Sequence, residues 1–448
     1  MSILIEKAKQ IESSLKLDEL LKHGFKKEIK GKADSHQTVT YPEKKHSCSV
    51  SPEEIFYHHT ENKDLSLYLH IPFCNTKCVY CQYTSFYEQS DEKIATYISA
   101  LKKEIDLASE LPEIKNSKIT SVYIGGGTPT YLSPSDLEDL LKHIQKKFNL
   151  TKNIEFTVES TPETILGGIG KEKLEILRKY GGNRLSIGIQ TFDNDILHSM
   201  NRKHNLEQAL SSIETAKEKF DNLNIDLIFG FPDQTLEAWE SDLNIIANMK
   251  IPPITIYPLT IKLEAAIYNL FEKNPKIFLD EKSYLLMDIM AIEIFKEMRF
   301  KNYPVWWFAS SPKYIYKQQI HKWENNGELL ALGISGYSYL NSWQYYNFRT
   351  MKEYFDSLNN NRLPIQKGIK LRTKKRQAIR NMVFGIKCKI DKCRFKGRYG
   401  FNPEEEFGKP ISKLENLGLI KNTEKEIKLT YKGKLFAEEV SRYFIKKL

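Results

Sequence analysis

Between residues 65 and 259 the chain alternates between short apolar runs and segments whose apolar residues recur every three or four positions. The runs have the length and β-branched content of buried strands, and the longer segments have the period of amphipathic helices. In the first helix, Ile94, Ile98, Leu101 and Ile105 would share one face. We therefore predict an α/β fold with six parallel strands, at residues 65–71, 119–124, 154–158, 184–189, 225–229 and 254–259.

Six strand–helix units are two fewer than a closed (β/α)8 barrel contains. The pattern thus predicts a partial, TIM-like (β/α)6 barrel. The C-terminal ends of parallel strands meet at one rim, where the following loops build ligand sites. Polar residues at the ends of the six runs are the first candidates for function.

The flanking patterns divide the chain into four expected segments. Residues 1–60 read as an amphipathic helix and an arm, 61–300 as the barrel, and 301–371 as an extension on the substrate side. Residues 372–448 are helical and Lys-rich and close with a short strand pair, which predicts an α-helical, winged-helix-like C-terminal cap. Aromatic residues crowd positions 303–323, either as core or as the wall of a pocket for a flat substrate.

Three cysteines follow the first strand, and their spacing, C-x3-C-x2-C, carries the strongest chemical signal. With six Cys in 448 residues this spacing would arise by chance in about one sequence in a thousand. A structural zinc site uses four ligands, usually in two pairs. Three thiolates from one loop fit a [4Fe–4S] cluster with one open iron. Its expected ligands are Cys74, Cys78 and Cys81.

The cysteine spacing, with Tyr80 before the last Cys, resembles the radical S-adenosylmethionine (SAM) superfamily. The run Tyr-x-His-Ile-Pro-Phe-Cys at residues 68–74 is similar to its oxygen-independent coproporphyrinogen III oxidase group. The resemblance implies that the open iron binds SAM and that the reduced cluster cleaves it to a 5′-deoxyadenosyl radical. It also implies a flavodoxin- or ferredoxin-type electron donor.

The resemblance assigns SAM contacts along the rim. Gly126, Gly127 and Thr128 match the segment that binds the methionine end of SAM. Further positions match motifs of the family. Two of them, Glu159 and Asp226, have carboxyl groups within apolar runs, and a buried carboxyl group must find a partner or face a cavity. These further SAM contacts are Tyr68, Glu159, Gln190, Arg202, Asp226 and Pro258.

Two tyrosines are expected at the reaction centre by the same resemblance: Tyr68, before the cysteine loop, and Tyr337, in a segment that returns to the site. The Thr-x-Tyr-Pro motif ending at Pro42 is either the group's N-terminal arm or a plain linker. The resemblance leaves open whether one SAM molecule binds or two. Cys388 and Cys393 cannot complete a metal site by themselves, and no His lies nearby in the sequence, so we interpret them, with Cys48, as ordinary thiols.

The net charge and the hydropathy of the chain give no sign of a nucleic-acid or membrane partner. The net charge of +10 comes from scattered lysines with no recognised nucleic-acid motif, so we expect no nucleic-acid partner. No apolar run approaches the roughly 20 residues of a membrane span, and charged residues interrupt the N-terminal helix, so we expect no membrane insertion and no secretory signal. A cytoplasmic monomer acting on a small molecule is the resulting expectation.

The predicted function is that of a radical SAM oxidoreductase. The leading hypothesis is coproporphyrinogen III oxidase-like: oxidative decarboxylation of a tetrapyrrole in haem biosynthesis. One alternative is a methyltransferase or cyclopropanase that uses two SAM molecules. The other is a haem chaperone of the same group. The Phe-Gln pair of true oxidases is absent from the aligned position, where Gln318 and Gln319 stand, which weakens the leading hypothesis.

Overall fold

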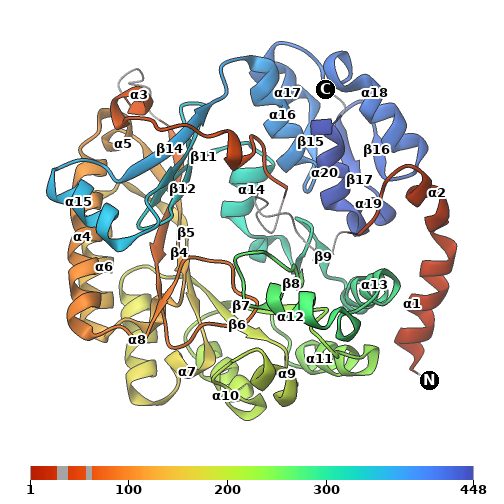
Figure 1. The fold of residues 1–448 in the computed structure, drawn as a ribbon, viewed down its shortest axis with the longest axis horizontal. Coiled ribbons are helices and arrows are strands. Elements are labelled where there is room, and N and C mark those ends of the chain that lie inside the picture. The colour runs from red at the N-terminus through yellow and green to blue at the C-terminus, as the bar shows by residue number, and fades with distance from the viewer. Residues whose placement is uncertain (1, 28–38, 57–62, 447–448) are drawn as a thin grey trace.

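The computed structural model describes residues 2–27, 39–56 and 63–446. In these ranges a curved twelve-stranded sheet forms the centre of the molecule (Figure 1), in the order β14-β13-β12-β11-β1-β4-β5-β6-β7-β8-β10-β9. All six predicted strands are present and parallel. Their bounds are β1 (Asp64–Ile71), β4 (Lys118–Gly126), β5 (Leu150–Ser160), β6 (Arg184–Gln190), β7 (Asn222–Phe229) and β8 (Pro253–Pro258).

The barrel stays open, as predicted. On one side β8 is followed by antiparallel β10 (Trp307–Ala309) and β9 (Lys301–Asn302). On the other side β11 (Glu328–Leu332) pairs in parallel with β1 and adds a seventh parallel strand to the six predicted. The α/β class and partial-barrel architecture are therefore confirmed.

Helices cover the outer face of the parallel strands (Figure 1). The first, α4 (Asp91–Ser109), begins after Ser90, whose hydroxyl accepts the Lys93 amide, and it buries Ile94, Ile98 and Leu101. The others repeat this amphipathic packing. They are α6 (Pro134–Lys147), α8 (Gly167–Lys179), α10 (Leu206–Lys217), α11 (Leu236–Asn248) and α13 (Glu281–Glu297).

The N-terminal helix differs from the single helix expected, because Lys16 adopts a left-handed backbone at φ 51° and breaks it. The two parts are α1 (Ile3–Ser14) and α2 (Leu17–Lys22). Helix α1 lies against α13, where Lys7 Nζ pairs with Glu293 at 2.9 Å and Glu297 at 2.7 Å. Much of the expected arm, residues 28–38, lies outside the described residues.

Beyond the barrel, α14 (Lys317–Trp323), α15 (Met351–Asn359) and antiparallel β12 (Tyr337–Leu340), β13 (Trp343–Asn347) and β14 (Ile365–Lys370) form the extension. The C-terminal cap carries a three-stranded sheet, β15-β17-β16, among helices, as a winged-helix-like unit does. The division of the chain into four segments stays a prediction. The cap elements are α16 (Lys374–Gly385), β15 (Ile390–Asp391), α17 (Lys392–Tyr399), α18 (Pro403–Asn416), β16 (Ile420–Asn422), β17 (Glu426–Leu429), α19 (Tyr431–Leu435) and α20 (Ala437–Lys446).

Short elements connect the larger ones. They are α3 (Pro52–Phe56), β2 (Phe73–Cys74), β3 (Phe86–Tyr87), α5 (Pro112–Lys115), α7 (Pro162–Ile165), α9 (Asn194–Ser199) and α12 (Ile267–Lys273).

Among the helices that the structure describes, none combines the length and apolarity that crossing a bilayer requires.

Candidate SAM and iron–sulfur site

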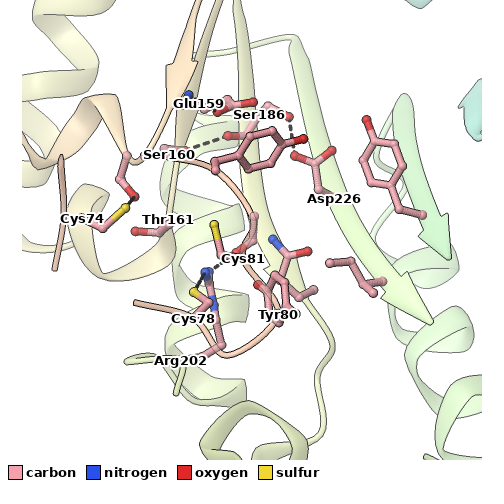
Figure 2. A pocket seen from close by; sticks show the side chains of 18 of the residues that line it. Cys74, Cys78, Tyr80, Cys81, Glu159, Ser160, Thr161, Ser186, Arg202 and Asp226 are labelled. Carbon is pink, nitrogen blue, oxygen red and sulfur yellow. Dashed lines mark hydrogen bonds between the residues drawn. The ribbon is translucent and has the colours of Figure 1, made fainter. Parts of the chain in front are cut away.

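A cavity of about 230 Å³ lies at the C-terminal ends of the parallel strands, at the rim where the sequence predicts a site. Eleven of the thirteen predicted site residues line it, and Figure 2 shows several of them from close by. The eleven are Cys74, Cys78, Cys81, Gly126, Gly127, Thr128, Glu159, Gln190, Arg202, Asp226 and Pro258.

The three cysteines lie on one loop after β1, and each side chain is partly buried. Burial raises the pKa of the Cys74 thiol to about 12 and also raises the pKa of the Cys81 thiol. These thiols stay protonated at neutral pH until a metal displaces the proton, because a coordinating thiol is deprotonated by its metal. Among the described residues, no three His, Cys, Asp or Glu side chains are grouped to hold a single metal ion. In a cluster each thiolate binds a different iron.

Residues 200–202, which directly follow helix α9, form hydrogen bonds with the cysteine loop. The Asn201 side-chain amide donates to Lys77 O at 2.9 Å, and the Val79 amide donates to Met200 O at 3.2 Å. Arg202 Nη1 lies 3.4 Å from Cys78 Sγ and donates to it, as Figure 2 shows. A second guanidinium nitrogen of Arg202 donates to Gly188 O, so the arginine connects β6 to the expected cluster.

The glycine segment supports the loop from the other side. Its amides are already used: Gly126 N donates to Glu159 Oε2 at 3.1 Å and Gly127 N donates to Ile71 O at 2.8 Å. A Cβ at Gly127 would lie 2.5 Å from Phe73 O and 2.9 Å from Cys74 Sγ. Close packing against the cysteine loop therefore requires glycine at position 127, and the contact of this segment with SAM stays a prediction.

Tyr68 and Tyr337 are the two predicted residues that do not line the cavity. The Tyr68 hydroxyl lies 3.0 Å from His70 Nδ1, while His70 Nε2 lies 2.9 Å from Thr84 O. Burial lowers the pKa of His70 to about 4, so the ring is neutral; Nε2–H donates to the carbonyl and Nδ1 accepts from Tyr68. Tyr337 lies in β12, where its hydroxyl donates to Gln344 at 3.0 Å.

Two buried carboxyl groups occupy the wall opposite the cysteines. Burial raises the pKa of Glu159 to about 7, and its partners are the Tyr123 hydroxyl and the Gly126 amide. Burial also raises the pKa of Asp226, which accepts from Ser186 Oγ at 2.8 Å. Both carboxyl groups would gain from a cationic or hydroxyl-bearing ligand.

The surroundings of Glu163 and Arg202 show whether the cavity lining suits SAM. Arg202 Nε is buried and lacks a hydrogen-bond partner within the described part of the chain, while Glu163 Oε2 and His204 Nδ1 are buried 3.6 Å from each other. Burial opposes ionisation of Glu163, but its contact with His204 and the charge of Arg202 outweigh this and lower its pKa to about 2. An unsatisfied guanidinium donor beside an ionised carboxylate suits the carboxylate and ammonium groups of an amino acid, which SAM carries. The residues fit the cofactor.

Several cavity residues were not predicted. On β6, Arg184 and Ser186 line the cavity together with Gly188 and Gln190. These positions alternate along the strand, so the period of two that places side chains on one face would have indicated them. Tyr123, Tyr257, Trp307 and Tyr316 add an aromatic wall, whereas Trp306 and Trp323 are buried core. Of the cluster at positions 303–323, Trp307 and Tyr316 therefore reach the cavity, and the pocket for a flat substrate stays a prediction.

Comparison with known proteins gives one family. Residues 68–246 match the radical SAM superfamily. The heme chaperone HemW of Lactococcus lactis is 30% identical over 390 residues, which cover 86% of this chain and 98% of the relative. HemW of Bacillus subtilis is 29% identical, over 86% of this chain and 100% of the relative. An oxygen-independent coproporphyrinogen III oxidase of Helicobacter pylori is 26% identical, over 87% and 88%.

Among solved structures, the coproporphyrinogen III oxidase HemN of Escherichia coli has the same fold. The TM-score is 0.79 at 24% identity, over 91% of this chain and 97% of HemN. This similarity shows that the chain has the fold of that protein over most of its length.

Proposed function

The chain belongs to the radical SAM superfamily, in the group that contains HemW and the oxygen-independent coproporphyrinogen III oxidases, and we propose that it cleaves SAM reductively at a [4Fe–4S] cluster. The observation that carries this proposal is the convergence of Cys74, Cys78 and Cys81 on a cavity that also presents Arg202 and Glu163. When bound by these cysteines, the cluster would supply the single electron that breaks the sulfur–C5′ bond of SAM, giving methionine and a 5′-deoxyadenosyl radical.

The chain's own residues bind and orient SAM in this proposal. Arg202 would hold the SAM carboxylate, and Glu163 the ammonium group. Asp226 would accept from ribose hydroxyls, and Glu159 would lie near the positive sulfonium. The aromatic wall of the cavity would exclude water from the 5′-deoxyadenosyl radical, because a radical that is exposed to solvent reacts unselectively. An external electron donor of the flavodoxin or ferredoxin type would reduce the cluster.

For the substrate, we propose a tetrapyrrole of haem metabolism that the protein binds and transfers to another molecule. The Lactococcus and Bacillus relatives are named heme chaperones. Coverage of the relatives supports transfer over decarboxylation: the Lactococcus and Bacillus HemW proteins align with this chain over 98% and 100% of their lengths, against 88% for the Helicobacter oxidase.

The second candidate is the coproporphyrinogen III oxidase reaction that the sequence suggested first. The aromatic wall of Tyr257, Trp307 and Tyr316 favours it, because flat rings would stack there once the cavity opens. In this reaction the radical would abstract a hydrogen atom from a propionate side chain, forming 5′-deoxyadenosine. The propionate radical would then lose carbon dioxide and pass one electron to an external one-electron acceptor, which leaves a vinyl group.

One anaerobic experiment separates these outcomes. The reconstituted protein is reduced with dithionite and given SAM, with haemin or coproporphyrinogen III. We expect 5′-deoxyadenosine and stable haemin binding without a vinyl product. Vinyl product with carbon dioxide identifies the oxidase instead, and S-adenosylhomocysteine identifies methyl transfer. Absence of 5′-deoxyadenosine, at the level of a Cys74→Ala/Cys78→Ala/Cys81→Ala control, contradicts SAM cleavage.

A further inference from the structure

A second cavity, of about 580 Å³, lies between the barrel and the C-terminal cap. Its barrel side comes from α13, β9 and β10, and its cap side from the segment after α16, β17 and α19. Figure 1 shows β17 and α19 beside β9 and α13. This interdomain cavity shares no lining residue with the cavity at the ends of the barrel strands, and its volume falls within the range of small-molecule sites.

Lysines dominate the polar part of the interdomain cavity. Five of its fifteen lining residues are Lys and only one, Glu426, is acidic. Carboxylates in or beside the lining pair with four of the lysines. Glu426 lies 2.6 Å from Lys428 Nζ and 3.8 Å from Lys389 Nζ, Glu438 lies 2.7 Å from Lys387 Nζ, and Glu293 lies 3.4 Å from Lys296 Nζ. The five lysines are Lys296, Lys387, Lys389, Lys428 and Lys434.

Lys434 has no carboxylate partner among the described residues. Its ammonium donates to the backbone oxygen of Asn302 at 2.8 Å, and burial lowers its pKa. The side-chain oxygen of Asn302 is also buried without a hydrogen-bond partner. A partly buried cation without a counter-ion is destabilising, so an anion that entered this cavity would stabilise it.

Most of the remaining lining is apolar or aromatic, with Asn302 as its one amide side chain. Ile292, Val305, Phe308 and Leu429 form a hydrophobic surface on both the barrel and cap sides. An ion as small as phosphate would leave this surface in water. An apolar body with carboxylates at its edge would cover the surface and reach the lysines together.

We propose that the interdomain cavity binds the tetrapyrrole through its carboxylate side chains, with Lys428 and Lys434 as the main anion contacts. This inference rests on the proposed function for its choice of tetrapyrrole. It places the tetrapyrrole outside the barrel, whose cavity keeps SAM. The cap then serves as a binding domain and not only as a cover.

The test uses fluorescence anisotropy of coproporphyrin III, a tetracarboxylate, with the full-length protein. We expect Lys428→Gln/Lys434→Gln to weaken binding about tenfold, as the loss of two charge-assisted contacts implies. A matched control, Lys142→Gln/Lys146→Gln on exposed α6 positions, should bind like the wild type. Thermal melting checks that both variants are folded.

Two further arms keep this test independent of SAM chemistry. The triple cysteine variant should bind the porphyrin as the wild type does, even if the protein fails to cleave SAM. The tetramethyl ester of the porphyrin, which lacks the charges, should bind at least about tenfold more weakly. Equal binding of the ester, an unchanged affinity in the lysine variant, or loss of binding in the cysteine variant would each overturn the proposal.

Discussion

Arg202 Nη1 donates a hydrogen bond to Cys78 Sγ across 3.4 Å, which joins the loop after β6 to the expected cluster ligand. The same side chain has a buried Nε without a partner and lies near ionised Glu163. One guanidinium thus faces both a sulfur and the space proposed for the amino-acid end of SAM.

Replacing Arg202 should therefore change two properties at once. In Arg202→Gln we expect SAM affinity to fall at least about tenfold, because a charge-assisted contact is lost. The midpoint potential of the cluster should become more negative, because hydrogen bonds to sulfur stabilise the reduced state. Redox titration followed by electron paramagnetic resonance (EPR) measures the second effect without SAM. Arg349→Gln, an exposed position, is the control; an unchanged potential in Arg202→Gln would contradict the sulfur contact.

Glu159 should make SAM binding depend on pH. Its pKa of about 7 means that the carboxyl is mostly protonated at pH 6 and ionised at pH 8. A cationic ligand binds the ionised form, so we expect affinity for SAM to rise about tenfold from pH 6 to pH 8. Isothermal titration of Glu159→Gln should give a flat and weaker response, whereas exposed Glu172→Gln should follow the wild type. A rise that persists in Glu159→Gln would assign the titration to another group.

His70 should make the fold less stable in mild acid. Its pKa is about 4 in the folded protein against 6.5 for the unperturbed group, so the unfolded chain binds more protons between these values. Stability then falls as the pH falls, by about 1 kcal/mol between pH 7.5 and 5.5 and about 3 kcal/mol by pH 4. Urea unfolding of the apoprotein measures this, with His23→Gln as the exposed control. If His70→Gln keeps the same pH dependence, His70 is not its source.

Glu104 should be essential for the packing of the extension against the barrel. This buried carboxylate accepts from Gly333 N at 2.7 Å, Asn347 Nδ2 at 2.7 Å and Tyr354 Oη at 2.6 Å. Glu104→Ala leaves three buried donors unsatisfied, so the unfolding free energy should drop by roughly 3 kcal/mol or more. Urea titration against exposed Glu110→Ala measures the loss, and a drop no larger than in that control would show that water replaces the carboxylate.

The strands of the barrel could be predicted because each is a near-continuous apolar run, which a strand buried on both faces requires. Strand β11 has such a run, Leu329 to Leu332, but its partner β1 lies some 260 residues earlier, and no local pattern indicates that pairing. The break at Lys16 was also unpredictable, because the apolar period continues through it while the backbone turns left-handed.

The cysteines and the rim residues could be found from motifs and strand ends. Tyr68 and Tyr337 were assigned by motif alone, and the structure engages their hydroxyls with His70 and Gln344 away from the cavity lining. Arg184 was missed because it begins a strand rather than ending one. Its place in the cavity follows from side-chain alternation along β6, which motif matching does not use.

The most direct test of the account is the EPR spectrum of the anaerobically reconstituted, reduced protein before and after SAM is added. The account predicts about four iron atoms per chain and a signal that changes when SAM binds the open iron. Cys393→Ala, an exposed cysteine outside the loop, should behave like the wild type, while Cys81→Ala should not. Zinc in place of iron, or a signal that SAM leaves unchanged, would contradict the central claim.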